Sequence, residues 1–297
     1  MVERAALSVV HRAQKRMYPY LTRRVADDAV FLNYGYEEAP PMGLALDPAD
    51  EPDRYHIQLY HVTATQSGGI TGKRVLEVGC GHGGGASYLT RAFAPTSYVG
   101  LDANAAGVAF CQHRHQVPGL QFVHGDAEDL PFPAESFDAV ISVESSHCYP
   151  HFDRFIAEVA RVLRPGGTFL YADVRHRADW ATRTEIVLNN APGLRLVSWR
   201  EIDAEVLRGM TLNSERIRAS MQRAAPRFLR RWLNDGLPVY GSAIYRNIAT
   251  GRDSYRMYCL VKTPNDDSDL RPDDRRASSG LWRAICAPNE RRVNRYP

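Results

Sequence analysis

A glycine-rich stretch at residues 75–91, VLEVGCGHGGGASYLTR, holds the residues whose spacing most clearly suggests chemistry. Its apolar start at 75–78, interrupted by Glu77, is short enough for a buried parallel strand. A strand, a glycine loop and a helix in this order bring a ligand's polar groups onto backbone N–H groups and a helix N-terminus. Glycine is needed there because a Cβ would block the approach or forbid residues with positive φ. The glycines of the loop are Gly79, Gly81, Gly83, Gly84 and Gly85.

The glycine loop alone leaves two interpretations open. Gly79, Gly81 and Gly84 fit G-x-G-x-x-G, a pattern found in dinucleotide-binding enzymes such as NAD-dependent oxidoreductases. A tight turn that binds nothing fits the same three glycines. The residues that follow in the chain must separate these interpretations.

Acidic residues follow the next apolar runs. Asp102 ends the run 97–101 and lies where a carboxylate can bind both hydroxyls of a ribose. A Gly-Asp-Ala block at 125–127 follows a third run, and Glu144 follows a fourth. Open α/β sheets bind their ligands at the carboxyl ends of the strands, so a binding site is expected where these runs end.

The order of these motifs resembles the class I S-adenosyl-L-methionine (SAM) methyltransferases. ExGxGxG, an acid after strand 2, GDA after strand 3, FDxVxSxE at strand 4 and LRPGG before strand 5 all lie in order between residues 75 and 173. The oxidoreductase interpretation explains neither Glu77 nor the GDA and LRPGG blocks. The resemblance implies an α/β, Rossmann-like class I methyltransferase fold. Its seven-stranded, mostly parallel sheet has helices on both faces, and an N-terminal cap and a helical lid insertion are added to it.

Further blocks resemble the phthiotriol/phenolphthiotriol dimycocerosates methyltransferases. These belong to a larger group that acts on lipids, including sterol and glycopeptidolipid-type substrates. The resemblance runs from about residue 18 to residue 262, and its blocks include FLN at 31–33, PPM at 40–42, LYH at 59–61, SHCYPH at 146–151 and SYRMYC at 254–259.

The resemblance also implies how SAM is held. The glycine loop approaches the amino-acid part and the ribose, and Glu77 bonds the ammonium group directly or through water. Asp102 binds the ribose hydroxyls, Asp126 accepts from the adenine amine, and Ala127 offers its backbone N–H. The expected cofactor-binding residues are Glu77, Gly79, Gly81, Gly83, Asp102, Asp126 and Ala127.

Methylation of an alcohol needs a base, because the hydroxyl must lose its proton during attack. Histidine suits this task near neutral pH. His147 lies just past the carboxyl end of strand 4 and is the expected catalytic base, with Glu144 as an alternative base or as the partner that orients His147. His151 and His82 are weaker candidates, and His82 is expected to touch the cofactor carboxylate. No metal site is expected.

Composition narrows the functional classes. The net charge of +3 and the lack of an N/D-P-P-Y block argue against a nucleic-acid methyltransferase. Five cysteines without a C-x-x-C pair indicate neither a disulfide framework nor a zinc site. No apolar run approaches the ~20 residues of a membrane-spanning helix, and no secretory signal is seen. A cytoplasmic protein is expected, and the sequence does not indicate its oligomeric state.

The chain divides into three expected regions. Residues 1–72 form an N-terminal helical cap, 73–262 the SAM-dependent methyltransferase domain with a lid at about 202–236, and 263–297 a flexible tail. The basic amphipathic helix expected at 1–24 either packs over the domain or contacts an anionic membrane surface, which would place the enzyme peripherally at the inner membrane surface. The expected strands are 73–79, 97–101, 120–124, 137–143, 168–173, 194–199 and an antiparallel 254–262, and the helices 54–65, 84–93, 104–115, 151–163 and most of 202–233.

The leading hypothesis is a SAM-dependent O-methyltransferase that acts on a hydroxyl of a long-chain lipid similar to phthiotriol. An O-methyltransferase of glycopeptidolipid or fatty-acyl hydroxyls is a close alternative, and a sterol- or quinone-type C-methyltransferase is a more distant one. A non-catalytic SAM-binding protein would keep the same motifs without turnover.

Overall fold

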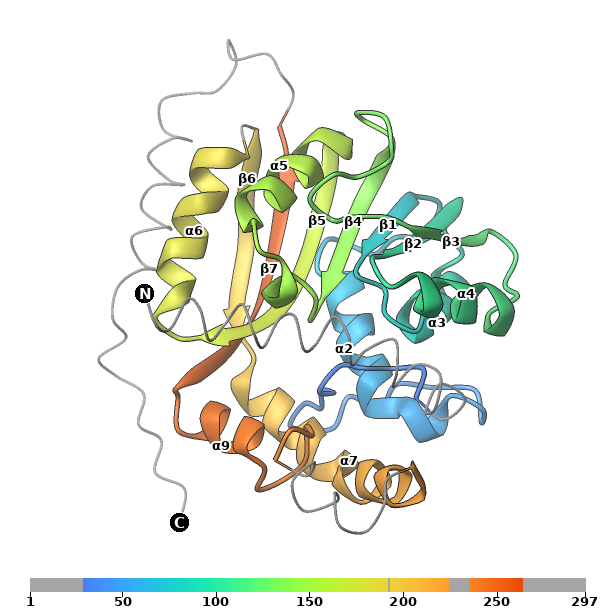
Figure 1. Ribbon diagram of the computed structural model, residues 1–297, viewed down its shortest axis with the longest axis vertical. Helices are drawn as coiled ribbons and strands as arrows, with labels where there is room; N and C mark the ends of the chain where they lie inside the picture. Colours follow the sequence, from blue (N-terminus) through green and yellow to red (C-terminus); the bar gives the residue numbers. More distant parts are fainter. Residues whose placement is uncertain (1–28, 192, 225–234, 264–297) are drawn as a thin grey trace.

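The computed structural model describes residues 29–191, 193–224 and 235–263, and its centre is a seven-stranded sheet (Figure 1). The strands lie in the order β3-β2-β1-β4-β5-β7-β6. Only β7 runs antiparallel to its two neighbours, β5 and β6. This confirms the predicted fold, including the antiparallel last strand. The strands are β1 (Arg74–Val78), β2 (Ser97–Asp102), β3 (Leu120–His124), β4 (Phe137–Val143), β5 (Leu163–His176), β6 (Leu194–Glu201) and β7 (Asp253–Lys262).

Helices cover both faces of the sheet (Figure 1). Val75 and Ile141 belong to the core cluster that α2 and α3 close, whereas Leu76 and Val140 belong to the cluster that α5 closes. Both sets are buried, as strands covered on two faces require. The described helices are η2 (Glu51–Asp53), α2 (Arg54–Thr65), α3 (Gly84–Phe93), α4 (Ala105–Arg114), η3 (Ser146–Cys148), α5 (Phe152–Val162), α6 (Asp179–Asn190), α7 (Asp203–Ala224) and α9 (Ala243–Ala249).

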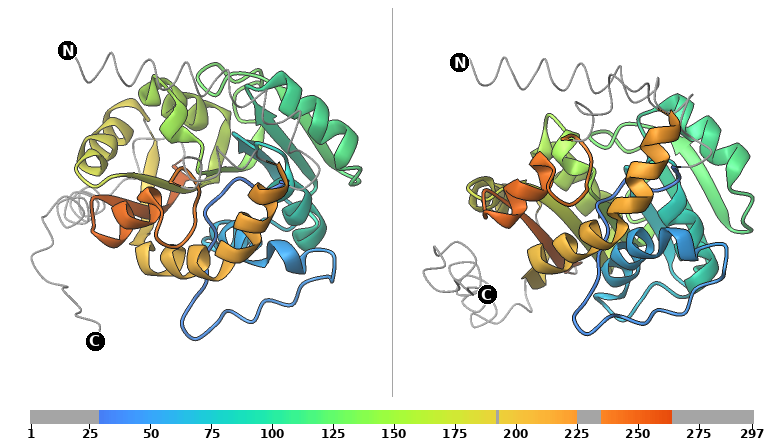
Figure 2. Two further views of the ribbon diagram at one scale, coloured as in Figure 1. Left: turned by 60° about the horizontal axis from the view of Figure 1, so that its bottom comes forward. Right: turned by 90° about the horizontal axis from the view of Figure 1, so that it is seen from below.

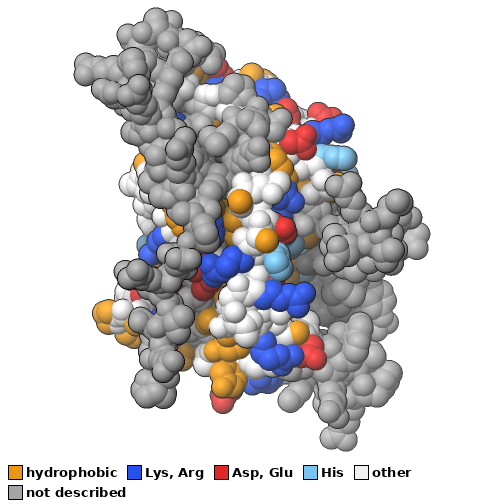
Figure 3. Space-filling model, turned by 90° about the vertical axis from the view of Figure 1, so that its left-hand side faces the viewer, with side chains coloured by type: hydrophobic (Ala, Val, Ile, Leu, Met, Phe, Trp, Pro, Cys, Tyr) orange, Lys and Arg blue, Asp and Glu red, His pale blue; other side chains and the backbone are white. Residues whose placement is uncertain are grey.

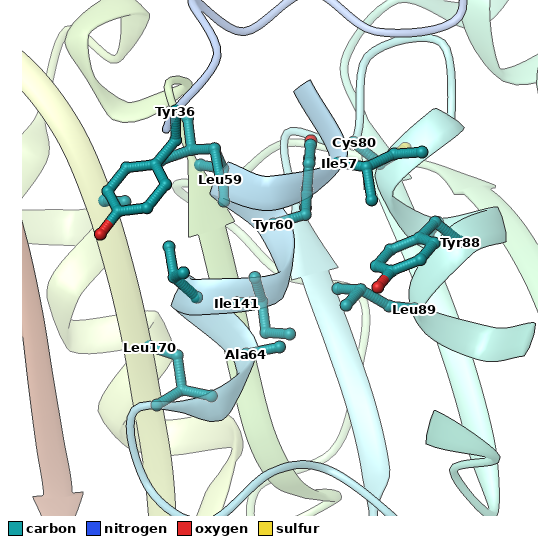
Figure 4. Packing of buried hydrophobic residues seen from close by; sticks show 14 of the residues in the cluster. Tyr36, Ile57, Leu59, Tyr60, Ala64, Cys80, Tyr88, Leu89, Ile141 and Leu170 are labelled. Carbon is teal, nitrogen blue, oxygen red and sulfur yellow. The ribbon is translucent and has the colours of Figure 1, made fainter. Parts of the chain in front are cut away.

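Helix α2 carries much of the first core cluster. Ile57, Leu59, Tyr60 and Ala64 lie on it and are buried against the sheet (Figure 4). Burying apolar area at roughly 25 cal/mol per Å² is what holds such a helix in place. The segment before strand 1 is therefore packed onto the methyltransferase core.

Helix α7, in the region expected to form the lid, lies against α2 and the chain that precedes it (Figure 2). A Cβ added to Gly209 of α7 would lie 2.4 Å from the backbone nitrogen of Tyr36. The two backbones can approach this closely only because residue 209 has no side chain. His56 of α2 also bonds to Asn213 of α7, with 2.8 Å between Nε2 and Nδ2. Helix α7 and the segment before strand 1 are thus joined directly.

The short helices η2 and η3 and the helices α6 and α9 were not predicted, and β5 begins five residues earlier than expected. Helix α6 was not predicted, because its main buried anchor, Trp180, packs against a distant part of the chain and donates from Nε1 to the carbonyl of Ser254 (3.0 Å). Helix α9 was not predicted because it is short. The feature in the sequence that indicates its start is the N-cap Ser242, whose Oγ accepts from the Tyr245 N–H. Strand β5 begins at Leu163 rather than at residue 168, because the predicted turn is an irregularity within the strand.

Some expectations lie outside the described residues, namely the helix at 1–24, the part of the expected lid at 225–234 and the tail after residue 263. Among the residues that are described, no helix combines the length and apolar character needed to cross a membrane. Strand β6 forms one edge of the sheet, and in the view from that side charged side chains of both signs are spread among the described residues (Figure 3). Strand β6 itself carries exposed Arg195, Arg200 and Glu201, and charges on an edge strand hinder its pairing with another chain.

Candidate active site

The glycine loop follows β1 and is held against the end of β2. The Gly79 N–H donates to the carbonyl of Leu101 (2.8 Å). Gly79, Gly81 and Gly83 all have positive φ (80°, 56° and 77°), so the predicted need for glycine is met by the backbone. A Cβ on Gly79 would also lie 2.3 Å from the Cβ of Ser145, so the ends of β1 and β4 are in close contact.

Asp102 lies at the carboxyl end of β2, as predicted, and its carboxylate supports the loop. Oδ2 accepts from the Gly81 N–H (2.9 Å) and Oδ1 from the Asn104 N–H (2.8 Å). Burial raises the pKa of Asp102, and these two bonds oppose the rise. Each oxygen keeps a second lone pair, so the carboxylate can still accept from a ribose.

The Gly-Asp-Ala block lies beside Asp102. The Gly125 N–H donates to the Asp102 carbonyl (3.1 Å), and Asp126 uses Oδ1 to accept from the Glu128 N–H (2.9 Å). Asp126 is exposed and Ala127 is buried. The structure thus brings the carboxyl ends of the first three strands together at one end of the sheet, as the sequence predicts.

Glu77 is buried in β1, one residue before the strand ends. Its two oxygens accept from the hydroxyls of Tyr60 (3.0 Å) and Tyr98 (2.8 Å). Burial raises the pKa of Glu77 to about 7, although both hydrogen bonds oppose the rise. A contact with a ligand ammonium would use the lone pairs that remain. Tyr60 of α2 therefore points at this carboxyl group.

The cap segment lies over the glycine loop. The carbonyl of Val30 accepts from the Gly84 N–H (3.1 Å), and His82 Nδ1 donates to the carbonyl of Ala29 (2.7 Å). His82 therefore bonds to the cap, a partner that the sequence did not predict. The Tyr34 N–H donates to Glu144 Oε1 (2.7 Å), so the cap also contacts the end of β4.

His147 is paired with Asp173, a residue of β5. His147 Nδ1 lies 2.9 Å from Asp173 Oδ1, and the His147 N–H donates to Oδ2 (3.0 Å). The Asp173 side chain is 0% exposed and that of His147 is 33% exposed. Burial lowers the pKa of His147, but the Asp173 carboxylate outweighs it and holds that pKa well above its usual value. In return, the pKa of Asp173 lies below its usual range.

Glu144 does not orient His147, which corrects one of its two expected roles. Its Oε1 accepts from the Tyr34 N–H and from the hydroxyl of Tyr255 (2.9 Å). Burial raises the pKa of Glu144 to about 8. The residue has a φ of 47°, a strained conformation of the kind that clusters at functional sites. The sequence did not predict the role of Asp173, although its place at the end of the expected strand 168–173 was a usable signal.

His151 lies away from this pair. It is exposed at the start of α5, where its N–H donates to Glu128 Oε1 (2.7 Å). In the described ranges, no group of three or more His, Cys, Asp or Glu side chains is arranged to hold a metal ion.

The buried hydroxyl of Tyr149 lies at the ends of β1 and β4. Tyr149 Oη has no hydrogen-bond partner among the described residues and would lie 2.7 Å from a Cβ on Gly79. A buried hydroxyl in a native fold is normally bonded. Together with the loop backbone and the carboxylate of Asp102, this unpaired donor fits a polar cofactor such as SAM at the ends of β1 and β4.

Known proteins are similar to this chain in both sequence and fold. Residues 76–171 match the family model described as "Methyltransferase domain". A "Fatty-acid O-methyltransferase" of Mycolicibacterium smegmatis is 55% identical over 262 residues, which are 87% of this chain and 93% of that protein. The "Phthiotriol/phenolphthiotriol dimycocerosates methyltransferase" of Mycobacterium tuberculosis is 54% identical over 256 residues, 86% of this chain and 94% of the relative.

Among solved structures, the [4+2]-cyclase SpnF is similar with a TM-score of 0.61 and 22% identity, over 85% of this chain and 97% of that one. At this identity the likeness shows the fold alone, and a shared fold does not imply a shared reaction. The two relatives carry the stronger argument because they are similar over nearly their whole length. The chain is therefore a SAM-dependent methyltransferase and belongs to the phthiotriol/phenolphthiotriol dimycocerosates methyltransferase family.

Proposed function

We propose that the enzyme methylates a hydroxyl of a long-chain lipid and that His147 is the general base. The observation that carries the proposal is the 2.9 Å contact between His147 Nδ1 and Asp173 Oδ1. A carboxylate can only accept, so it fixes the proton on Nδ1 and leaves Nε2 as the nitrogen that accepts a proton. The names of the two relatives, one a triol methyltransferase and one a fatty-acid methyltransferase, support a lipid acceptor.

The division of labour follows from the chemistry of methyl transfer. SAM supplies an already activated methyl group when it is bound. The protein must then align the acceptor oxygen and remove its proton as the new bond forms. His147 Nε2 takes that proton, and Asp173 stabilises the resulting imidazolium through its charge. Glu144 is the alternative base, because burial raises its pKa to about 8.

The residues proposed to hold SAM are those at the ends of the first three strands. Asp102 would bind the ribose hydroxyls, Asp126 and Ala127 the adenine, and the loop glycines 79, 81 and 83 the amino-acid part, with Glu77 towards the ammonium. We propose further that Tyr149 donates its unpaired hydroxyl to the cofactor. Domain 73–262 would perform the reaction, while the cap (1–72) and the lid (about 202–236) enclose the lipid.

A fatty-acid carboxylate is the second candidate acceptor, favoured by the name of the 55% identical relative. A carboxylate is already ionised at neutral pH and needs no base. The His147–Asp173 pair would have no use in that reaction, which favours a hydroxyl acceptor.

The experiment is to incubate purified protein with methyl-labelled SAM and a total lipid extract, and then to separate the labelled lipids. We expect label in an alkali-stable methyl ether, since an ether resists the hydrolysis that cleaves a methyl ester. Label only in alkali-labile esters would favour the carboxylate acceptor, and label only in small water-soluble products would overturn the lipid proposal.

The basic amphipathic pattern at 1–24, outside the described residues, supports a transient contact with an anionic membrane surface. Co-sedimentation with vesicles of phosphatidylglycerol and phosphatidylcholine tests this contact. Binding should fall in a chain that begins at residue 29, and equal binding of both chains would contradict it.

A further inference from the structure

The buried Ser146, which directly precedes His147, forms hydrogen bonds with three side chains. Its Oγ donates to Asp173 Oδ2 (2.7 Å) and accepts from Arg175 Nη2 (2.7 Å). The hydroxyl of Tyr171 lies 2.7 Å from the same oxygen. Through this one hydroxyl, a guanidinium is connected to the carboxylate that orients His147.

Arg175 is a buried cation that none of the roles proposed above uses. It is 9% exposed, and its Nη2 lies 3.7 Å from Asp173 Oδ2. Its Cζ lies 5.3 Å from the centre of the Phe152 ring, and its Nε has no partner in the described part of the chain. A buried guanidinium is costly unless it neutralises a buried charge, and the fully buried Asp173 is the neighbouring anion.

Two cations therefore compete for the role of counter-ion to Asp173. If Asp173 had only His147, the buried carboxylate would hold the imidazole in its protonated form, which cannot accept a proton, up to a still higher pH than it does beside Arg175. Arg175 stays charged at every relevant pH, because a guanidinium does not lose its proton in proteins. With Arg175 in place, Asp173 remains neutralised when His147 is deprotonated.

We propose that Arg175 is the permanent counter-ion of Asp173 and thereby sets the pH above which His147 can act as a base. Arg175 is a positioning residue in this scheme, acting through Asp173 and Ser146, and the functional part of the inference rests on the proposed role of His147. The charge of Arg175 lowers the proton affinity of His147 in two ways, by neutralising Asp173 and by direct repulsion.

Other charged or titratable groups near His147 and Asp173 also influence the pKa values of the pair, some raising and some lowering them. Around His147 and Asp173, the titratable or charged groups come from the end of β4, from η3, from β5, from α6 and from β7. They are Glu144, Cys148, Tyr171, Arg175, Arg183 and Tyr255. Arg183 of α6 offers a matched control, because its Cζ also lies over the Phe152 ring, 4.4 Å from its centre.

The test is a titration of His147 by NMR in ¹³C-histidine-labelled protein, with the signal assigned from His147→Asn. Arg175→Gln keeps a donor for Ser146 but removes the charge, so the pKa of His147 should rise by about 1 unit or more. Arg175→Lys keeps the charge and should stay close to wild type. Arg183→Gln should produce a smaller rise, because its guanidinium is not bonded to Ser146.

The pH dependence of kcat/KM provides the second readout. In Arg175→Gln the acidic limb of the pH–rate profile should move to higher pH by the same amount as the pKa of His147. Below that pKa, kcat/KM should fall about ten-fold per pH unit, and it should recover at high pH. A merely structural role would lower activity equally at all pH values. If Arg175→Gln does not fold, Ser146→Ala, which breaks the connection but keeps every charge, should still move the titration of His147 in the same direction.

The outcomes separate this inference from the proposed function. An unchanged His147 titration in folded Arg175→Gln, or an equal rise in Arg183→Gln, would overturn the role of Arg175. A raised titration with no shift of the acidic limb would show that Arg175 controls His147 but that His147 is not the base, which overturns the functional part of the inference and the proposed mechanism together.

Discussion

Asp173→Asn is the substitution that most directly disturbs the proposed base. The side chain holds His147 through Nδ1 at 2.9 Å and through the backbone N–H at 3.0 Å. Loss of one charge-assisted hydrogen bond costs about 1.5–3 kcal/mol, or roughly 10–10²-fold in rate. An asparagine that turns its NH₂ towards Nδ1 also reverses the tautomer and removes the base entirely. We therefore expect turnover to fall by about 10²–10⁴-fold.

The assay compares turnover, SAM affinity and pH dependence in Asp173→Asn and in the control Glu144→Gln, which removes another acid at the same edge of the sheet. SAM affinity should be unchanged in Asp173→Asn. Since Asp173 holds the pKa of His147 above its usual value, any residual acidic limb should move to lower pH. Turnover within about three-fold of wild type, or a large loss in Glu144→Gln alone, would refute the reasoning and leave Glu144 as the base.

Three further predictions follow from the loop, the lid and the buried acids. Asp102→Ala should weaken SAM binding by about 1–3 kcal/mol, and unchanged affinity in calorimetry would remove it from the site. Gly209→Ala should lower the free energy of unfolding by about 1–3 kcal/mol because its Cβ meets the cap backbone, whereas Leu212→Ala, 51% exposed on the same helix, should stay within about 0.5 kcal/mol in denaturant unfolding. SAM is a cation and the pKa of Glu144 is raised to about 8, so binding at pH 7 should release protons, and a binding enthalpy independent of buffer would contradict this.

The sheet could be predicted because its strands are short apolar runs that end in distinctive residues. The expected strands 120–124 and 137–143 and the expected helices 54–65 and 84–93 have the observed boundaries. Helix α6 escaped prediction because Trp180 is buried against β7, more than seventy residues later in the chain. Such contacts leave little periodicity in the local sequence.

The site residues at the ends of the strands could be predicted from the sequence. The contacts that depend on the turns after the strands could not. Asp102 and Asp126 lie at the edge of the sheet where the motifs place them. The pairing of His147 with Asp173 depends on η3 turning back over β5, which no local pattern shows. The two tyrosines that bond to Glu77 come from α2 and β2, and only the packing of these elements brings them together.

The most direct measurement uses two acceptors of equal chain length, a long-chain secondary alcohol and the corresponding fatty acid, with labelled SAM and with wild type and His147→Ala. Wild type should form a methyl ether from the alcohol. In His147→Ala that product should fall by about 10²–10⁴-fold while SAM affinity is kept. An ester from the fatty acid as the only product, formed equally by both proteins, would contradict the proposed function.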